Sequence, residues 1–479
     1  MLSLAREKGE VRVDQGSELG ALREVLAMAL PIIVAMASNT LMYFADSWMV
    51  SRVGTNEIAA VGPAGAWVFV LISFLFGVVT CTSTFVGQGY GAGNYPDCAR
   101  YAWQGIYVSL ILGLPAVFLW QVAPAIFRAI GHGAEVQQRE VIYFQIRLLS
   151  ISAMAITAAL ASFFQAISRP RIAMVVVIFA NVVNVVLNYI LIYGKLGFPA
   201  MGIGGAAIAT VIASWLQAAI MLAVFLSPAF NRKFSSRRSA GWDWHRIGRL
   251  FSIGLPAGVN FGLDVASWAV FTNLLIGRLG DIPLAASTIA TQIMHLSFMP
   301  TVGLSIAITA LVGQWIGRKD IPAAKRRTYV ALKLGVGWMF VMGILFFLFR
   351  AKLIAVFRPD PEVVQIGSTI LIVAAIFQIF DATGIVMSGA LKGAGDTRWV
   401  AVVTVSYAWL IFLPASYLLA FKAGLGAAGA WVGAAAYIFS LAMTLLWRFH
   451  SERWRTIDVF GRAEITPYDL GPFPPSSAE

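Results

Sequence analysis

Twelve apolar stretches divide this chain of 479 residues, and each is long enough to cross a bilayer as a helix. A bilayer core needs about 20 apolar residues per helix. Only 12% of the residues are charged, about half the share found in soluble domains. We therefore predict an all-α integral membrane protein with twelve transmembrane helices. Their centres fall near Val34, Leu71, Ile111, Met154, Val183, Ala213, Val259, Met299, Met339, Val373, Leu410 and Ala435.

Positive charge is unevenly distributed between the predicted loops. An even number of helices puts both termini on one side, and cytoplasmic loops carry an excess of Lys and Arg. With the N-terminus inside, the inner segments hold 24 of the 35 Lys and Arg residues, many of them in 231–249 and 317–327. We predict a multi-pass protein of the inner (plasma) membrane with both termini in the cytoplasm. The net charge of +12 then reflects these loops, and we expect no nucleic-acid partner.

The two halves of the chain resemble each other. "LP" at 30–31 returns at 255–256, "VGQ" at 86–88 returns at 312–314, and a small-residue run from Gly202 is echoed from Gly426, always 224 to 226 residues later. Internal duplication is typical of secondary transporters, whose substrate site lies between the halves. We predict two pseudo-symmetric six-helix lobes, with Pro31 and Pro256 opening corresponding helices. The expected order is an N-terminal tail (1–20), an N-terminal lobe (21–230), a basic linker (231–249), a C-terminal lobe (250–449) and a C-terminal tail (450–479).

Three carboxylates lie well inside apolar stretches: Asp46, Asp264 and Asp381. Each would cost roughly 2.5–3.5 kcal/mol at the centre of a lipid-exposed helix, so such residues are expected to face a cavity and to mark an ion or substrate path. Spacing from the flanking charges puts Asp264 near the middle of the membrane and Asp381 well inside it. Asp46 is closer to the outer interface, where local pairing is the alternative.

Polar neighbours accompany these acids. Asn260 precedes Asp264 by one turn, and Gln378 precedes Asp381 by three residues, so each shares a helix face with its carboxylate. The fifth predicted helix carries a stripe of asparagines spaced three and four apart, which we expect either to line a cavity or to form interhelical hydrogen bonds. Gln292 is a weaker candidate on the eighth helix. The asparagine stripe consists of Asn181, Asn184 and Asn188.

Two basic side chains also fall in apolar surroundings. Arg147 is expected to extend outward to the interface or to pair with a carboxylate, and His295 either is structural or carries protons. No phosphate-binding glycine-rich loop and no metal-ligand spacing is present in the sequence. We therefore predict a protein that is not an enzyme, needs no cofactor and draws on an ion gradient.

Five segments together make the chain similar to a known family. They are "MYFADSWMVSRVG", "VGQGYGAGN", "LNYILIYGKLGFPAMGIGGAAIAT", "GLPAGVNFGLD" and "FQIFDATGIVMSGALKGAGDTR", in this order between about residues 21 and 448. With the duplication, they resemble the multidrug and toxic compound extrusion (MATE) transporters, in particular the NorM branch. The resemblance implies two lobes that rock between inward-open and outward-open states. It also implies export of amphipathic, often cationic compounds in exchange for Na⁺ or H⁺.

The resemblance also assigns roles to individual residues. Asp381 matches the acidic cation-site residue of the tenth span, and Asp264 takes the place in the seventh span where the family usually has Glu. Asp46 matches the Asp of the first span that features in proton-coupling proposals. This chain has Phe377 where a Tyr often precedes the acid of the tenth span, and Asn188 where some relatives carry an Asp.

The working hypothesis is competitive antiport by a monomer embedded in the lipid bilayer. Burial favours the neutral form of Asp264 and Asp381, which enables them to take up protons, and alternatively the two carboxylates share one Na⁺. Cation entry would neutralise the site and weaken its hold on an amphipathic organic cation, and the coupling is reciprocal. The alternatives are a lipid-linked oligosaccharide flippase of the same superfamily, which would favour a basic cavity, a membrane-embedded enzyme and a channel.

Overall fold

A computed structural model of the protein describes residues 17–130, 132–457 and 459–460. Within them, eleven long apolar helical segments and one pair of helices bent by 45° are suited to cross a membrane. Every one of the twelve predicted span centres falls on one of these segments, so the prediction of an all-helical protein with twelve spans is confirmed. Most of both predicted tails lies outside the described residues.

The first six spans form the N lobe, and three of them consist of two helices. The bent pair α6 and α7 forms the fourth span. In chain order the helices are α1 (Glu18–Ser51), α2 (Thr55–Thr80), α3 (Thr82–Gly91), α4 (Tyr95–Gly113), α5 (Leu119–Ile130), α6 (Ala134–Leu148), α7 (Ile151–Ala166), α8 (Pro170–Tyr193) and α9 (Gly202–Phe225).

The last six spans form the C lobe, which follows the short helix α10 (Pro228–Phe234). The eleventh span, Thr397–Lys422, is interrupted by two π-helical turns. The helices are α11 (Trp244–Val270), α12 (Asp281–Gly317), α13 (Ile321–Phe357), α14 (Pro361–Gly393), α15 (Thr397–Tyr407), α16 (Leu413–Tyr417) and α17 (Gly426–His450).

Corresponding helices of the two halves begin in the same way. α4 starts at the cap Asn94, whose side chain accepts the N–H of Asp97 (3.4 Å). α13 starts at the cap Asp320, whose side chain accepts the N–H of Ala323 (2.9 Å). Both caps are followed two residues later by a proline, which is tolerated in a first turn because that turn has no intrahelical partner for its N–H. The duplication seen in the sequence therefore extends to local backbone chemistry.

Pro31 and Pro256 lie inside α1 and α11, not at their starts. The expectation that they open helices was wrong, because each helix continues upstream as a segment that packs on the opposite lobe. Ala21 and Val25 of α1 join the core of the C lobe, next to residues of α12 and α14. Ile247 and Leu250 of α11 join the core of the N lobe. The first helix of each lobe thus changes its packing partner along its length.

The lobes meet at one end of the molecule, which we call the closed end, formed by the start of α1, α3 and the end of α12. Its contacts follow the duplication. Gln88 Nε2 donates to the carbonyl of Gly393 (3.3 Å), and Gln314 Nε2 donates to the carbonyl of Ala166 (2.7 Å). Each glutamine therefore reaches into the opposite lobe, as a two-fold relation between the lobes requires.

Two glycines allow α3 and α12 to cross in direct backbone contact. A Cβ at Gly91 would collide with the carbonyl oxygen of Gln314, and one at Gly317 would collide with that of Gln88. Small residues are what permit such close approach between membrane helices.

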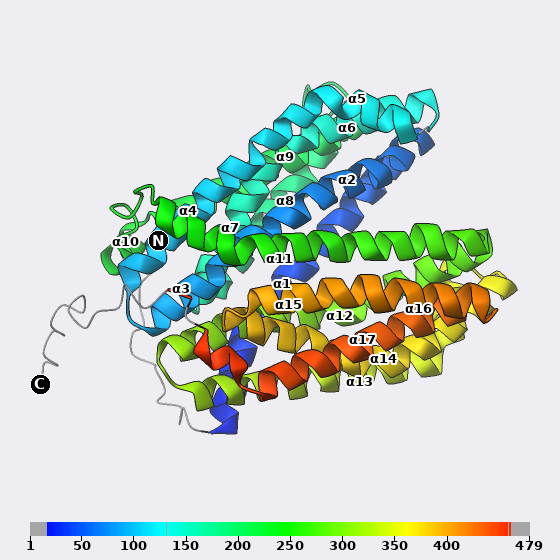
Figure 1. The fold of residues 1–479 in the computed structure, drawn as a ribbon. Helices are drawn as coiled ribbons and strands as arrows, with labels where there is room; N and C mark the ends of the chain where they lie inside the picture. The colour runs from blue at the N-terminus through cyan, green and yellow to red at the C-terminus, as the bar shows by residue number, and fades with distance from the viewer. Residues whose placement is uncertain (1–16, 131, 458, 461–479) are drawn as a thin grey trace, which may run out of the picture.

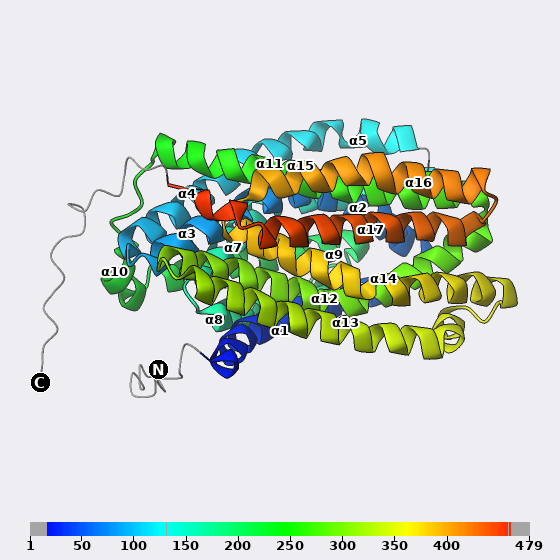
Figure 2. The same cartoon turned by 60° about the horizontal axis from the view of Figure 1, so that its bottom comes forward.

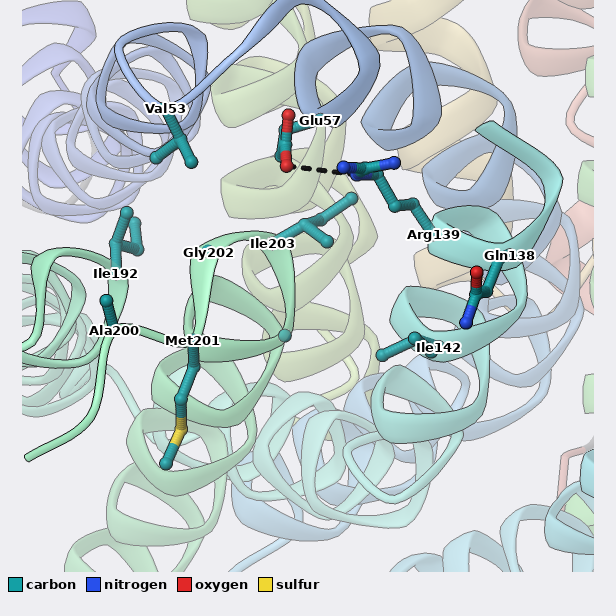
Figure 3. A pocket seen from close by; sticks show the side chains of 11 residues that line it. Val53, Glu57, Gln138, Arg139, Ile142, Ile192, Ala200, Met201, Gly202 and Ile203 are labelled. Atoms are coloured by element: carbon teal, nitrogen blue, oxygen red, sulfur yellow. Dashed lines mark hydrogen bonds and ion pairs between the residues drawn. The ribbon is translucent and has the colours of Figure 1, made fainter. Parts of the chain in front are cut away.

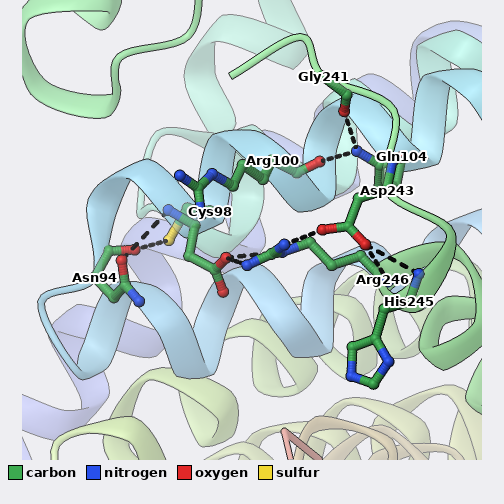
Figure 4. A network of polar contacts seen from close by, with 9 residues as sticks. Asn94, Cys98, Arg100, Gln104, Gly241, Asp243, His245 and Arg246 are labelled. Carbon is green, nitrogen blue, oxygen red and sulfur yellow. Dashed lines mark hydrogen bonds and ion pairs between the residues drawn. The ribbon is translucent and has the colours of Figure 1, made fainter. Parts of the chain in front are cut away.

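A polar network joins the start of α11 to α4 at the closed end (Figure 4). The guanidinium of Arg246 binds Asp97 through Nη2 (2.8 Å) and Nε (3.0 Å), and it also pairs with Asp243. Burial alone would raise the pKa of Asp243, but hydrogen bonds from the backbone N–H and the guanidinium of Arg246 lower it below its usual value. Asp243 is therefore stabilised in its ionised form beside Arg246, which also pairs with Asp97 of α4.

Away from the closed end the two groups of helices diverge. Figure 1 shows the N-lobe helices, with α5 and α6 at their far end, turning away from the C-lobe helices around α16. The beginning of α1 and the end of α17 lie together at the closed end in Figure 1 and Figure 2. We call the opposite end the splayed end.

Candidate functional site

Asp264 of α11 and Asp381 of α14 lie near each other inside the C lobe. Both are half-buried, and their charges interact electrostatically. The hydroxyl of Tyr437 on α17 donates to Asp264 Oδ1 (3.4 Å). Three helices thus contribute oxygen atoms to one place within the membrane-spanning segments.

The Tyr437 hydroxyl supplies an oxygen that sequence reasoning did not find. One turn before Asp381 the chain has Phe377, which has no hydroxyl and stacks on Trp431 (centroids 6.4 Å apart). Tyr437 is itself buried and stacks on Phe412 (5.3 Å). Nothing in the local sequence of α17 marks Tyr437, because its relation to Asp264 arises only from helix packing.

Lys392, near the end of α14, is a second neighbour that the sequence did not reveal. Its ammonium group interacts electrostatically with Asp264. Its backbone carbonyl accepts a hydrogen bond from Thr84 Oγ1 of α3 (2.9 Å), which places this residue where the lobes meet. Lys392 therefore places a positive charge within electrostatic range of Asp264, without an ion pair to either carboxylate among the described residues.

The other predicted C-lobe residues are found in different environments. Asn260 is buried, and its Oδ1 has no hydrogen-bond partner among the described residues. Gln378 donates to Ser297 Oγ (2.8 Å), so it joins α14 to α12. Gln292 and His295 are exposed on α12.

The asparagine stripe of α8 faces α1 and α9. Asn181 Nδ2 donates to Ser38 Oγ (2.9 Å) and to Asn39 Oδ1 (3.0 Å). Asn184 bonds to Thr210 Oγ1 of α9 (3.4 Å), and Asn188 donates both to Asn184 Oδ1 (3.2 Å) and to Asp46. The stripe is thus engaged in interhelical hydrogen bonds, and it brings Asp46 into the same network.

Arg147 lies at the end of α6, and its side chain is only 6% exposed. The expectation that it extends outward was wrong. The alternative, association with a carboxylate, is closer to what is found, because Arg147 interacts electrostatically with Asp46. Arg147 also borders a cavity of about 250 Å³ in the N lobe, together with Asn39, Asn181 and Thr210.

A second hollow, of about 450 Å³, lies among the ends of α2, α6, α8 and α9 (Figure 3). Glu57 and Arg139 form an ion pair in its wall (2.9 Å). Because the two charges neutralise each other, the described residues that line this hollow offer no unpaired charge to a ligand.

No group of three or more His, Cys, Asp or Glu side chains suited to a metal ion occurs within the described residues. A Na⁺ ion would have to combine Asp264 and Asp381 with neutral oxygens. The Tyr437 hydroxyl, which bonds to Asp264, and the unpartnered Oδ1 of Asn260 on α11 are two such oxygens.

The sequence and the fold are similar to those of known proteins. The MatE family model matches residues 31–190 and 262–418. The chain belongs to the MatE family. The multidrug resistance protein NorM of Burkholderia vietnamiensis is 32% identical over 429 residues, covering 88% of this chain and 92% of that protein. The probable multidrug resistance protein NorM of Pseudomonas putida is 30% identical over 456 residues, covering 93% and 96%. The predicted resemblance to MATE transporters of the NorM branch is confirmed.

Solved structures of MATE transporters share the fold. The eukaryotic MATE transporter AtDTX14 has a TM-score of 0.81 and 22% identity, covering 91% of this chain and 97% of that one. A multidrug resistance MATE family transporter in an outward-facing conformation has a TM-score of 0.82 and 20% identity, with the same coverage. The predicted two-lobed MATE fold is thereby confirmed.

Proposed function

We propose that this MatE-family protein is a multidrug efflux transporter that exports amphipathic, mostly cationic organic compounds by antiport with Na⁺ or H⁺. The relatives named NorM support the efflux function. The observation that carries the coupling step is the pair of carboxylates Asp264 and Asp381, held inside the C lobe with the hydroxyl of Tyr437. Ionisable residues within membrane spans are by default part of a transport path.

The coupling follows from competition for these carboxylates. In the ionised form they attract a cationic substrate, and binding of Na⁺ or H⁺ removes that attraction. Reciprocity requires that the substrate weakens cation binding by the same factor. The ammonium group of Lys392 balances part of the acidic charge when neither ligand is bound.

The orientation proposed is the one favoured by the basic loops, with both termini in the cytoplasm of a cell whose inner membrane holds the protein. The closed end is then cytoplasmic, and the described conformation faces outward. Rocking about the crossing of α3 and α12 would exchange the two ends, as expected for lobes related by a repeat. A monomer contains both lobes and so suffices for this motion.

A lipid-linked oligosaccharide flippase would need a basic surface for the pyrophosphate group. The interior of the C lobe is dominated by two carboxylates against one Lys, which favours organic cations over such a lipid.

The test is ethidium efflux from proteoliposomes under an imposed Na⁺ gradient or pH gradient, one at a time. Wild-type protein is expected to respond to one of the two gradients, and Asp264→Asn and Asp381→Asn to neither. Asp360→Asn is the matched control, since Asp360 caps α14 through the N–H of Glu362 (3.1 Å) and Asn caps equally well. Full gradient-driven efflux in Asp264→Asn would overturn the assignment.

A further inference from the structure

Arg147 is a buried cation whose hydrogen-bonding capacity is not used. Its Nε and Nη1 are covered by protein, yet neither has a hydrogen-bond acceptor within the described residues. Buried guanidinium groups are normally satisfied by a carboxylate, because leaving a charged donor unpaired is costly. An acceptor from outside the chain would remove this cost.

The nearest carboxylate does not fill this role. Asp46 interacts electrostatically with Arg147, but the hydrogen bond that it accepts comes from Asn188, and neither Nε nor Nη1 of Arg147 donates to it in the described part of the chain. The backbone holds Arg147 at the bend between α6 and α7, where its carbonyl accepts the hydroxyl of Ser150 (2.7 Å). Its position is therefore set by the fold and not by an acidic partner.

The cavity beside Arg147 has the composition of a binding site for an amphipathic anion. Among the described residues that line it, Arg147 is the only charged side chain. Amide groups of Asn39, Gln165 and Gln217 provide further hydrogen-bonding atoms, and Met154 and Met174 provide apolar wall. Pockets for organic molecules typically combine a mostly apolar lining with a few placed polar groups.

We propose that this N-lobe cavity is an anion subsite, in which Arg147 binds the carboxylate of zwitterionic amphipathic substrates. A guanidinium matches a carboxylate with two parallel hydrogen bonds, which a neutral ester cannot reproduce. The inference rests on the proposed efflux function and names the residue that would distinguish substrates with an anionic group from those without one. Cationic groups are recognised by the acids of the C lobe, and anionic groups by Arg147 of the N lobe.

The test uses two dyes that differ only in one group: tetramethylrhodamine with a free carboxylate, and its methyl ester. In proteoliposomes, Arg147→Gln is expected to lower transport of the acid by at least about tenfold and to leave transport of the ester unchanged. Arg147→Lys keeps the charge but loses the paired geometry, and is expected to fall in between. Arg139→Gln, on the same helix, is the matched control and is expected to leave the ratio of the two dyes unaltered.

The outcomes separate the possible roles. Equal loss of both dyes in Arg147→Gln would mean that Arg147 only supports the fold, and no loss of either would mean that it does not contact substrate; both overturn the subsite. Wild-type protein that transports neither dye would contradict the proposed efflux function instead. If the variant does not reach the membrane, competition on purified wild-type protein decides. Benzoate should displace the acid and not the ester, and failure to do so overturns the proposal.

Discussion

At the closed end the two lobes make similar contacts at corresponding positions, whereas their interiors carry different charged groups. Gln88 and Gln314 make equivalent bonds across the interface. In the interior, Asp264 of the C lobe corresponds, 225 residues earlier, to Asn39, which borders the N-lobe cavity. Residues where the lobes touch must fit each other under the two-fold relation, so they stay alike. Interior residues face no such constraint and are free to bind different groups.

The largest effect is expected when the interior of the C lobe is made to resemble that of the N lobe. Asp264→Asn copies the side chain found at Asn39 and is expected to lower ethidium efflux by at least about 100-fold, because the cation loses its charged partner.

The reverse exchange, Asn39→Asp, puts a carboxylate into the cavity that Arg147 lines. It should lower transport of a carboxylate-bearing dye about tenfold and leave its ester unaffected. Dye flux in proteoliposomes measures the effect of each variant. If Asn39→Asp lowered transport of the carboxylate-bearing dye and of its ester equally, the assignment of anion recognition to the N lobe would be contradicted.

The next largest effect is expected where the lobes cross. Gly91→Leu and Gly317→Leu place a side chain against a carbonyl of the opposite lobe. Overpacking that costs about 1–3 kcal/mol would disfavour the conformation with the closed end shut roughly 5- to 150-fold. The distance between spin labels on α5 and α16, measured by pulsed EPR, should shorten as the splayed end closes. Gly62→Leu and Gly337→Leu are controls, since neither position has a neighbour within 4 Å. Because of the two-fold relation, the two test variants should behave alike.

A smaller effect is expected from the glutamines. Gln314 makes two bonds, to the carbonyl of Ala166 and to Ser168 Oγ (2.9 Å), whereas Gln88 makes one across the interface. At about 1 kcal/mol per bond, Gln314→Ala should shift the same EPR distance distribution more than Gln88→Ala. A larger shift for Gln88→Ala would show that the number of hydrogen bonds a glutamine makes across the interface does not determine how strongly it stabilises the closed end.

The smallest effect is expected from Tyr437→Phe. Its bond to Asp264 is long (3.4 Å), so its loss should change the ion concentration for half-maximal efflux by less than about threefold. The maximal rate should stay the same. A collapse of transport would mean that the hydroxyl is an essential ligand of the coupling ion.

Hydropathy and repeated motifs were sufficient to predict the spans and the duplicated plan, because both are encoded locally. The positions of Pro31 and Pro256 within their helices could not be predicted. The turns of α1 and α11 that precede these prolines are recognisable only by their packing on the opposite lobe, as when Ile247 of α11 packs in the core of the N lobe. The same reason explains Tyr437 and Arg147. Their roles depend on helices distant in sequence, and the apolar or basic character of a single residue does not reveal its neighbours.

We infer that ion coupling resides in the C lobe. Its most direct test is gradient-driven ethidium efflux in proteoliposomes containing Asp264→Asn, Asp381→Asn or Asp46→Asn, each at equal protein content. We expect that the two C-lobe variants lose the response to the driving gradient, while Asp46→Asn, whose carboxylate is already bonded to Asn188, keeps it. Retention of the response in both C-lobe variants together with its loss in Asp46→Asn would place ion coupling in the N lobe instead.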